Sequence, residues 1–366
     1  MDLFGIMYLR GTLKSPIIIH MRIRHIHIEG YKVFNDFDID FCLGGTPRKL
    51  MVVTGANGSG KTILLRDIIS GNAIAGKAKY AITVQDDNGV NTLSFPVYPA
   101  TGAHVGYFSK IWFYDTINDR CMERLQEGMI NYIDRLIHEK RKNSFVAYAE
   151  LQNMMDEIFI GFNLQIRFEG LGVDNKPIFV NSRNEEFGME GLSSGELQVL
   201  SGMLLLFTTD LKGHVILIDE PEKSLHPSWQ FGILPVLRRC SEISDCQIIV
   251  VTQSPQVIAS AHREEIRLFV RDDGGYVRAK VCECDPYGWT VGQVLTQIQG
   301  VTHLRVPEID DKLVVLKDML RGNKHGAVEF KERFSELERI LGYSDQDLIL
   351  IRLEVIRREK KECNGL

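Results

Sequence analysis

LMVVTGANGSGKTILLRDIISG, residues 50–71, is the stretch that decides the fold of this chain. Residues 51–54 form a short, largely β-branched run that predicts a buried strand, and apolar residues recur at helical spacing from position 63 onward. Between them lies an octapeptide that fits G-x-x-x-x-G-K-[S/T] at every fixed position: Gly55, Ala56, Asn57, Gly58, Ser59, Gly60, Lys61 and Thr62. A glycine loop between a strand and a helix is the context that a phosphate-binding P-loop requires.

The residue types of this loop suit a nucleoside triphosphate with Mg²⁺. Glycines let backbone N–H groups approach the dense negative charge closely, and the N-terminus of the following helix adds a positive dipole end. Lys61 can reach the β- and γ-phosphates, and the Thr62 hydroxyl can ligate Mg²⁺. The alternative is a chance glycine turn, which a complete motif in this context disfavours.

A second group of polar residues follows the apolar run 214–218, which is typical of a central parallel strand. Asp219 ends this run and is expected beside the P-loop, where it can hold Mg²⁺. Glu220 is placed to act as the general base on an attacking water. A strand that merely ends in a polar turn is the alternative, and the P-loop upstream favours the functional interpretation.

Composition limits the class of protein. The chain has 366 residues, of which 44% are hydrophobic and 25% charged, so length suggests two domains or one large α/β domain. A net charge of −5 indicates no overall basic field for nucleic acid. Seven dispersed cysteines predict reduced thiols in the cytoplasm, and no apolar run approaches the roughly 18 residues of a membrane span. Residues 1–20 are interpreted as a loose extension rather than a signal peptide.

Hydrophobic periodicity predicts the remaining elements. We expect strands at 21–28 and 36–41, a hairpin of 79–84 with 91–98, helices within 116–158, strands at 159–168 and 177–180, a hairpin of 266–270 with 276–284, and helices from 289 onward. His25 and His27 share a strand face, where a solvated polar face is favoured over a metal pair. Cys282 and Cys284 are likewise interpreted as neighbouring thiols rather than metal ligands.

LSSGELQ, residues 192–198, precedes a leucine-rich helix. The simple interpretation is a serine N-cap. The segment also resembles the LSGGE signature of ABC-type ATPases, with Ser193, Ser194, Gly195 and Glu196 in the pattern and Ser194 at its first glycine. A helix N-terminus with serine hydroxyls is an anion site suited to a γ-phosphate.

EKSLHP, residues 222–227, looks like the D-loop of the same family, with Ser224, Leu225 and His226 as its key positions. Gln253 then stands where the family usually has the histidine that contacts the γ-phosphate. An amide can donate a hydrogen bond but cannot carry a charge, so slow or partner-dependent hydrolysis is expected. The Q-loop glutamine is not placed; Gln85 lies in a hairpin, and residues 115 and 118 are an aspartate and an asparagine.

Residues 21–285 together resemble an ABC-type ATPase of the SMC/RecF/OLD-like group, and YKVF at 31–34 resembles that group's FKSF. The resemblance implies an α/β head with a mixed or parallel central sheet, an antiparallel β-lobe, a short helical lobe inserted at about 116–160 and a helical tail at 286–366. The insertion is too short for long coiled-coil arms, and the tail is too short for a Toprim nuclease domain. The chain looks most like stand-alone ATPase subunits of bacterial defence systems such as the Septu type.

This resemblance implies a function and partners. Two protomers bind head to tail around ATP and Mg²⁺, with the P-loop of one facing Ser193, Ser194 and Gly195 of the other. The ATPase then gates a separate effector, a nuclease or toxin, as a homodimer or higher oligomer that can also contact DNA and does not enter a membrane. Two alternatives remain: a RecF-like DNA repair ATPase, and a nucleotide-gated scaffold that holds a partner through its tail. A transporter ATPase is disfavoured.

Overall fold

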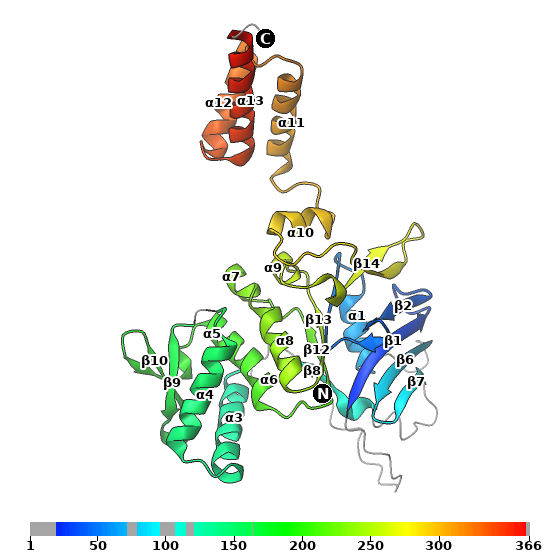
Figure 1. The fold of residues 1–366 in the computed structure, drawn as a ribbon, viewed down its shortest axis with the longest axis vertical. Coiled ribbons are helices and arrows are strands. Elements are labelled where there is room, and N and C mark those ends of the chain that lie inside the picture. The colour runs from blue at the N-terminus through cyan, green and yellow to red at the C-terminus, as the bar shows by residue number, and fades with distance from the viewer. Residues whose placement is uncertain (1–19, 72–78, 96–106, 115–120, 163, 364–366) are drawn as a thin grey trace. The chain divides into compact units, whose positions relative to one another are not determined.

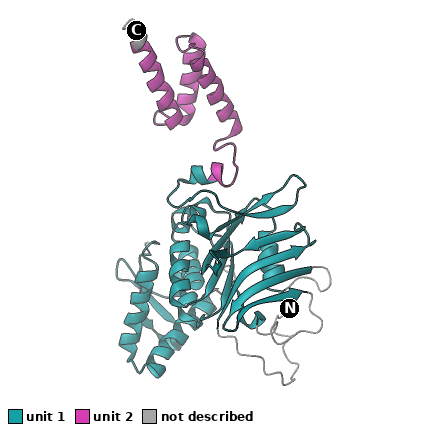
Figure 2. Ribbon diagram, turned by 45° about the vertical axis from the view of Figure 1, so that its right-hand side comes forward, with its two compact units in different colours: residues 1–294 teal, residues 295–366 magenta. Residues whose placement is uncertain are grey.

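The computed structural model describes residues 20–71, 79–95, 107–114, 121–162 and 164–363. The expected extension therefore lies outside the described residues, apart from His20. The chain divides into two compact units, residues 1–294 and 295–366 (Figure 2). Among the described helices, none combines the length and the apolar character that crossing a membrane demands.

A six-stranded sheet forms the centre of unit 1. Its strands, in spatial order, are β15 (Val277–Val281), β14 (Ile266–Arg271), β5 (Leu50–Gly55), β13 (Gln247–Val251), β12 (Val215–Asp219) and β8 (Ile111–Tyr114). The strands from β14 to β8 pair in parallel, and β15 pairs antiparallel with β14 as the expected hairpin. β5, β12 and β13 are almost wholly buried, because parallel strands are covered on both faces.

The pairing register brings the two predicted site segments to one edge. β13 lies between β5 and β12, so that Val251 is paired with Val53 on one side and with Asp219 on the other. The carboxyl ends of these three parallel strands therefore lie together. Ligands of open α/β sheets bind outside such ends.

An antiparallel sheet packs against this centre. Its order is β2 (Phe37–Asp40), β1 (Met21–Glu29), β6 (Lys79–Asp86) and β7 (Gly89–Phe95). Figure 1 shows this sheet, in blue to cyan, on one side of the central strands. The buried side chains of Ile23, Ile26 and Ile28 share one core with Val53 and with Leu64 of the helix that follows the P-loop. The predicted hairpin is confirmed as far as Phe95, with β6 and β7 joined at Asp86 and Gly89; residues 96–98 of the prediction lie outside the described residues. A two-stranded ribbon, β3 (Cys42–Leu43) with β4 (Thr46–Pro47), follows β2.

A helical lobe occupies the other side of unit 1 (Figure 1). It contains α3 (Cys121–Asp134), η2 (Arg135–Glu139), α4 (Ser144–Ile158) and a small sheet of β9 (Ile166–Leu171), β10 (Pro177–Asn181) and β11 (Glu186–Phe187). The strand predicted at 159–168 begins later than expected, because β9 begins only at Ile166; residue 163 lies outside the described residues. Phe159 and Phe162 are instead buried in a turn, where the ring of Phe162 packs against Trp229. Burial against a distant helix therefore overrides the local strand preference.

Shorter helices connect the strands of unit 1. They are α1 (Lys61–Ile63), η1 (Leu64–Ile69), η3 (Val173–Asn175), η4 (Met189–Gly191), α5 (Ser194–Val199), η5 (Leu200–Leu204), α6 (Leu205–Thr208), α7 (Pro227–Gln230), α8 (Ile233–Ile243), α9 (Pro255–Ile258) and η6 (Arg263–Glu265). The helices after the P-loop and after the serine segment both contain a π-helical stretch, η1 and η5. Such bulges are frequent near functional sites.

Unit 2 has a small core of its own. α10 (Val291–Gln297) spans the boundary, and α11 (Pro307–Arg321), α12 (Val328–Leu341) and α13 (Gln346–Cys363) follow it. Leu316, Phe330 and Leu348 are buried together where these three helices meet. The C-terminal region is thus helical, as the apolar spacing predicts.

Candidate nucleotide-binding site

The P-loop takes a backbone path that requires glycine. Gly60 has a φ of +88°, and a Cβ atom there would lie 2.6 Å from Val33 Cγ2 and 2.8 Å from Phe34 Cζ. Gly55 is equally confined, since its Cβ would lie 2.5 Å from the carbonyl oxygen of Phe269. The glycines of the motif therefore serve close packing against the 31–34 segment and β14 as well as the approach to phosphate.

Lys61 is folded back onto its own loop. Its side chain is buried, and Nζ donates hydrogen bonds to the carbonyl oxygens of Gly55, at 2.8 Å, and Ala56, at 2.9 Å. Burial lowers the pKa of Lys61, whereas the charges of Glu220 and Asp219 raise it in opposition. The Lys61 ammonium group is therefore bound by backbone carbonyl oxygens of the loop, in the region where the motif is expected to bind phosphate oxygens.

Thr62 and Asp219 meet although 157 positions separate them. The Thr62 hydroxyl lies 3.4 Å from Asp219 Oδ1, and Arg66 Nε lies 3.5 Å from Oδ2. Only 7% of the Asp219 side chain is exposed, and this burial raises its pKa, with the charge of Arg66 and the hydrogen bond from Thr62 opposing the rise. A hydroxyl and a carboxylate side by side are oxygen ligands of the kind that Mg²⁺ takes.

Glu220 is held on both carboxylate oxygens. Gln253 Nε2 donates to Oε1 at 2.7 Å, and Lys223 Nζ lies 2.6 Å from Oε2. The hydrogen bond from Lys223 is the main cause that lowers the pKa of Glu220, and the bond from Gln253 adds to it against the effect of burial. Lys223 is a neighbour that sequence reasoning missed; its spacing of three residues from Glu220 is the only local sign of the contact.

The serine segment forms the start of α5. Ser193 caps the helix: its hydroxyl accepts from the N–H of Glu196 at 3.2 Å, and its own N–H donates to the Glu196 carboxylate at 2.8 Å. Ser193 and Ser194 are exposed. Gly195 packs against a ring, since its Cβ would lie 3.0 Å from Trp229 Cζ3. The N-terminus of α5 is therefore open to solvent and lies beside the ring of Trp229.

The 222–227 segment links several of these parts. Ser224 has a φ of +64°, Leu225 is buried, and His226 caps α7 by accepting from the N–H of Ser228. Gln198 of α5 donates its side-chain amide to the carbonyl oxygen of Lys223. Sequence reasoning did not identify this contact, which ties the serine helix to the segment that follows Glu220.

Gln85, one of the residues considered for the Q-loop, lies on the antiparallel sheet and not at this edge. Gln85 lies in β6 and accepts from Arg24 at 2.8 Å, on the antiparallel sheet. Asp115 and Asn118 lie outside the described residues. Tyr114, the last residue of β8, donates its hydroxyl to the carbonyl oxygen of Ser201.

The two predicted polar pairs take different arrangements. His25 Nε2 and His27 Nδ1 both lie 3.0 Å from Asp38 Oδ1, on a partly exposed strand face. His27 and Asp38, with Asp36, also form a group of oxygen and nitrogen atoms close enough to share a cation. The Sγ atoms of Cys282 and Cys284 lie 3.8 Å apart.

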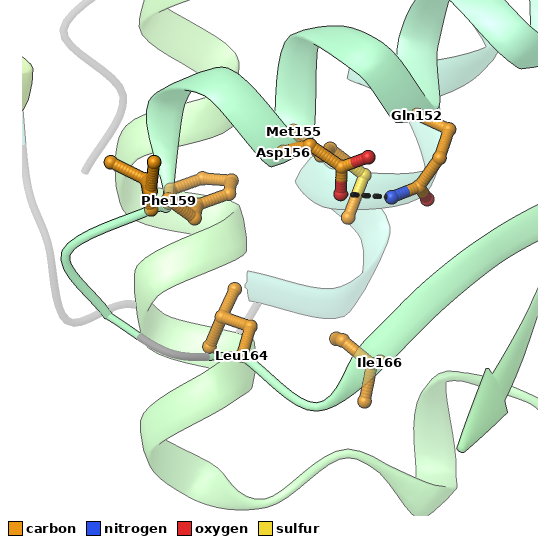
Figure 3. A pocket seen from close by; sticks show the side chains of 7 residues that line it. Gln152, Met155, Asp156, Phe159, Leu164 and Ile166 are labelled. Atoms are coloured by element: carbon orange, nitrogen blue, oxygen red, sulfur yellow. Dashed lines mark hydrogen bonds between the residues drawn. The ribbon is translucent and has the colours of Figure 1, made fainter. Parts of the chain in front are cut away.

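A small pocket of about 190 Å³ lies in the helical lobe (Figure 3). It is lined by Gln152, Met155, Asp156, Phe159, Ile160, Leu164 and Ile166. Gln152 and Asp156 hydrogen-bond to each other on one wall, and the remaining lining is apolar. None of the residues predicted to bind nucleotide lines it.

Comparisons with known proteins show what the chain is similar to. A family model described as "AAA domain, putative AbiEii toxin, Type IV TA system" matches residues 114–259, and a second, described as "AAA domain", matches residues 25–98. The chain is 25% identical to the Septu protein PtuA of Bacillus thuringiensis, over 62% of this chain and 59% of that protein. It is 28% identical to "Retron Ec83 probable ATPase" of Escherichia coli, over 66% of this chain and 45% of that protein.

The chain thus spans about half the length of these two curated relatives. Among solved structures, the SMC head domain from Thermotoga maritima is similar at 16% identity and a TM-score of 0.43, covering 72% of this chain and 100% of that one. The P-loop, the acidic end of β12 beside it and the two AAA-domain matches lead to one assignment. The chain is similar to P-loop ATPases with an AAA domain, among them Septu protein PtuA and the retron Ec83 probable ATPase.

Proposed function

We propose that this chain binds and hydrolyses ATP with Mg²⁺, and that it is the regulatory subunit of a bacterial defence system. The observation that carries the proposal is that the Thr62 hydroxyl of the P-loop lies beside the Asp219 carboxylate. The adjoining Glu220 accepts a hydrogen bond from Gln253. Residues from three separate parts of the chain converge there on one set of groups for triphosphate chemistry.

Each group has a role in this proposal. Lys61 exchanges its carbonyl acceptors for phosphate oxygens, while the loop N–H groups bind the remaining phosphate charge. Thr62 and Asp219 would hold Mg²⁺, which supplies neutralisation of phosphate charge. Glu220 orients the attacking water and takes its proton.

The exposed start of α5 completes the proposal for a dimer. Ser193, Ser194 and Gly195 of one protomer would face the phosphates held by the P-loop of its partner, with Ser224, Leu225 and His226 near the same interface. A C2 arrangement satisfies both nucleotide sites at once. ATP then joins the protomers, and hydrolysis separates them.

The separate effector is proposed on the relationship to Septu protein PtuA and the retron ATPase. Closing and opening of the dimer would release or activate a nuclease or toxin. A RecF-like DNA ATPase is the rival, and it predicts DNA binding that weakens steeply with salt. DNA affinity that does not depend on salt would count against that rival.

Solution mass of the Glu220→Gln protein, with and without Mg-ATP, tests the proposal. Removing the base should trap bound ATP, so the mass should double with ATP, and the added Ser194→Arg change should abolish the doubling. Gln198→Arg is unsuitable as a control because Gln198 contacts the 222–227 segment. Ser182→Arg, at an exposed serine between β10 and β11, is the matched control. A mass that stays monomeric with saturating ATP would contradict the ATP-closed dimer.

A second candidate is a nucleotide-gated scaffold with little turnover. The observation in its favour is Gln253, which occupies the place of a residue able to carry charge and which bonds directly to Glu220. ATP-dependent dimer formation without measurable phosphate release by the unmodified chain would favour this scaffold.

A further inference from the structure

Glu222 makes an unusual set of contacts that the proposed roles do not use. Its Oε1 accepts three hydrogen bonds: from the Thr252 hydroxyl at 2.6 Å, and from the backbone N–H groups of Gln253 and Ser254 at 3.1 Å each. The Thr252 hydroxyl in turn accepts from the Ser254 N–H at 3.0 Å. One carboxylate oxygen of Glu222 therefore accepts hydrogen bonds from the three residues that directly follow β13.

The carboxylate is buried at this point. Oε2 is inaccessible to solvent and has no hydrogen-bond partner among the described residues. Burial raises the pKa of Glu222, and the hydrogen bonds from Thr252 and the two backbone N–H groups oppose that rise. Since a buried acid is costly unless it is hydrogen-bonded, these three donors hold the side chain in one orientation.

Gln253 joins this carboxylate to the proposed general base. Its backbone N–H donates to Glu222, whereas its side-chain amide donates to Glu220 at 2.7 Å. Glu222 thus contributes to holding the backbone of Gln253, and the position of that backbone limits which atoms the amide can reach. Glu222 is also the first residue of the 222–227 segment. A displacement of that segment would therefore move Gln253, and through Gln253 also Glu220.

We propose that Glu222 is a positioning residue, which clamps residues 252–254 so that Gln253 holds Glu220 for catalysis and links Glu220 to the 222–227 segment. This inference rests on the proposed ATPase function for its catalytic consequence, but the clamp itself does not. An apolar side chain at 222 would leave the N–H groups of Gln253 and Ser254 without this acceptor, and the segment would loosen.

Amide hydrogen exchange tests the clamp without any nucleotide. In Glu222→Ala, the peptide 252–256 should exchange about tenfold faster or more, because two backbone N–H groups lose their acceptor. The P-loop peptide 55–62 should exchange as before. Glu169→Ala is the matched control, since Glu169 is a half-exposed carboxylate of β9 that pairs only with Arg167 among the contacts described. Unchanged exchange of 252–256 in Glu222→Ala would overturn the inference.

Steady-state kinetics tests the catalytic consequence. We expect kcat to fall about tenfold in Glu222→Ala, with KM for ATP within about twofold, because the P-loop contacts are separate from the clamp. Glu222→Gln keeps the shape of the side chain and one carbonyl acceptor, so its kcat should lie between that of the unmodified chain and that of Glu222→Ala. This second variant guards against a folding defect in Glu222→Ala. Wild-type kcat in Glu222→Ala would overturn the positioning role. Absence of ATP turnover in the unmodified chain would instead contradict the proposed function, and hydrogen exchange would still decide the clamp.

Discussion

At the scale of the residue, the neighbours Lys223 and Gln253 lower the pKa of Glu220. Lys223 is half-exposed, with 52% of its side chain accessible, whereas 20% of the Glu220 side chain is accessible. The pair covers one carboxylate oxygen that a water-activating base needs free. Because partly exposed ion pairs contribute up to about 1 kcal/mol, Lys223 restrains Glu220 only modestly.

Replacing Lys223 by alanine should therefore speed ATP turnover. Without the ammonium group, the pKa of Glu220 moves back up toward its ordinary value and Oε2 becomes available, which should raise kcat about two- to fivefold. Steady-state phosphate release measures the effect, and Lys212→Ala serves as the control at an exposed lysine. A lower kcat in Lys223→Ala would show that Lys223 assists the reaction instead.

At the scale of the element, the P-loop depends on a segment that comes earlier in the chain. Val33 and Phe34, between β1 and β2, fill the space that a side chain at Gly60 would need. Phe34 also contacts Phe37 and Phe269, so the fit extends into the core shared by both sheets. The loop conformation is thus a property of the packed elements as well as of its glycines.

A methyl group at Gly60 should consequently cost both stability and ATP affinity. Gly60→Ala combines a positive φ with a clash against Val33 and Phe34, so we expect a loss of about 1–3 kcal/mol in the free energy of unfolding. Gly44→Ala is the matched control, because Gly44 also has a positive φ of +56° but open space around it, and only about 1 kcal/mol is expected there. Urea unfolding of both variants measures the loss in the free energy of unfolding. Equal losses in the two variants would contradict a steric clash of the Gly60→Ala side chain with Val33 and Phe34.

At the scale of the whole molecule, each of the two units has its own buried core. The division falls between Val294 and Leu295, and the backbone N–H of Gly288 bonds to Ala259, so residues soon after 286 belong with unit 1. Two separate cores in one chain usually unfold as separate cooperative steps.

Removing residues 301–366, which leaves α10 whole, should delete one calorimetric transition and spare nucleotide binding. At roughly 0.7 kcal/mol per residue near 60 °C, the lost transition should carry on the order of 45 kcal/mol of unfolding enthalpy. The ATP dissociation constant of the shortened chain should stay within about twofold of the full chain, because the P-loop and Asp219 lie in unit 1. A large loss of ATP affinity would show that unit 2 supports the site.

Much of the fold was predictable from local patterns. The P-loop between a strand and a helix, the acidic end of β12, the hairpin of β6 with β7 and the helical C-terminal region each follow from short-range spacing. The boundary of β9 was not predictable, because Phe162 is buried against Trp229, which lies far along the chain. Local preference cannot anticipate such packing.

The sequence by itself determined which chemical groups the site contains, since the motif G-x-x-x-x-G-K-T and the pair Asp219–Glu220 are contiguous. Only the tertiary structure decided how they are held. The insertion of β13 between β5 and β12 brings Gln253 to Glu220, and Glu222 to the backbone beyond β13. These contacts join residues about 30 positions apart in the sequence, which strand pairing brings together. The spacing of residues along the chain does not predict which loop a given carboxylate will contact.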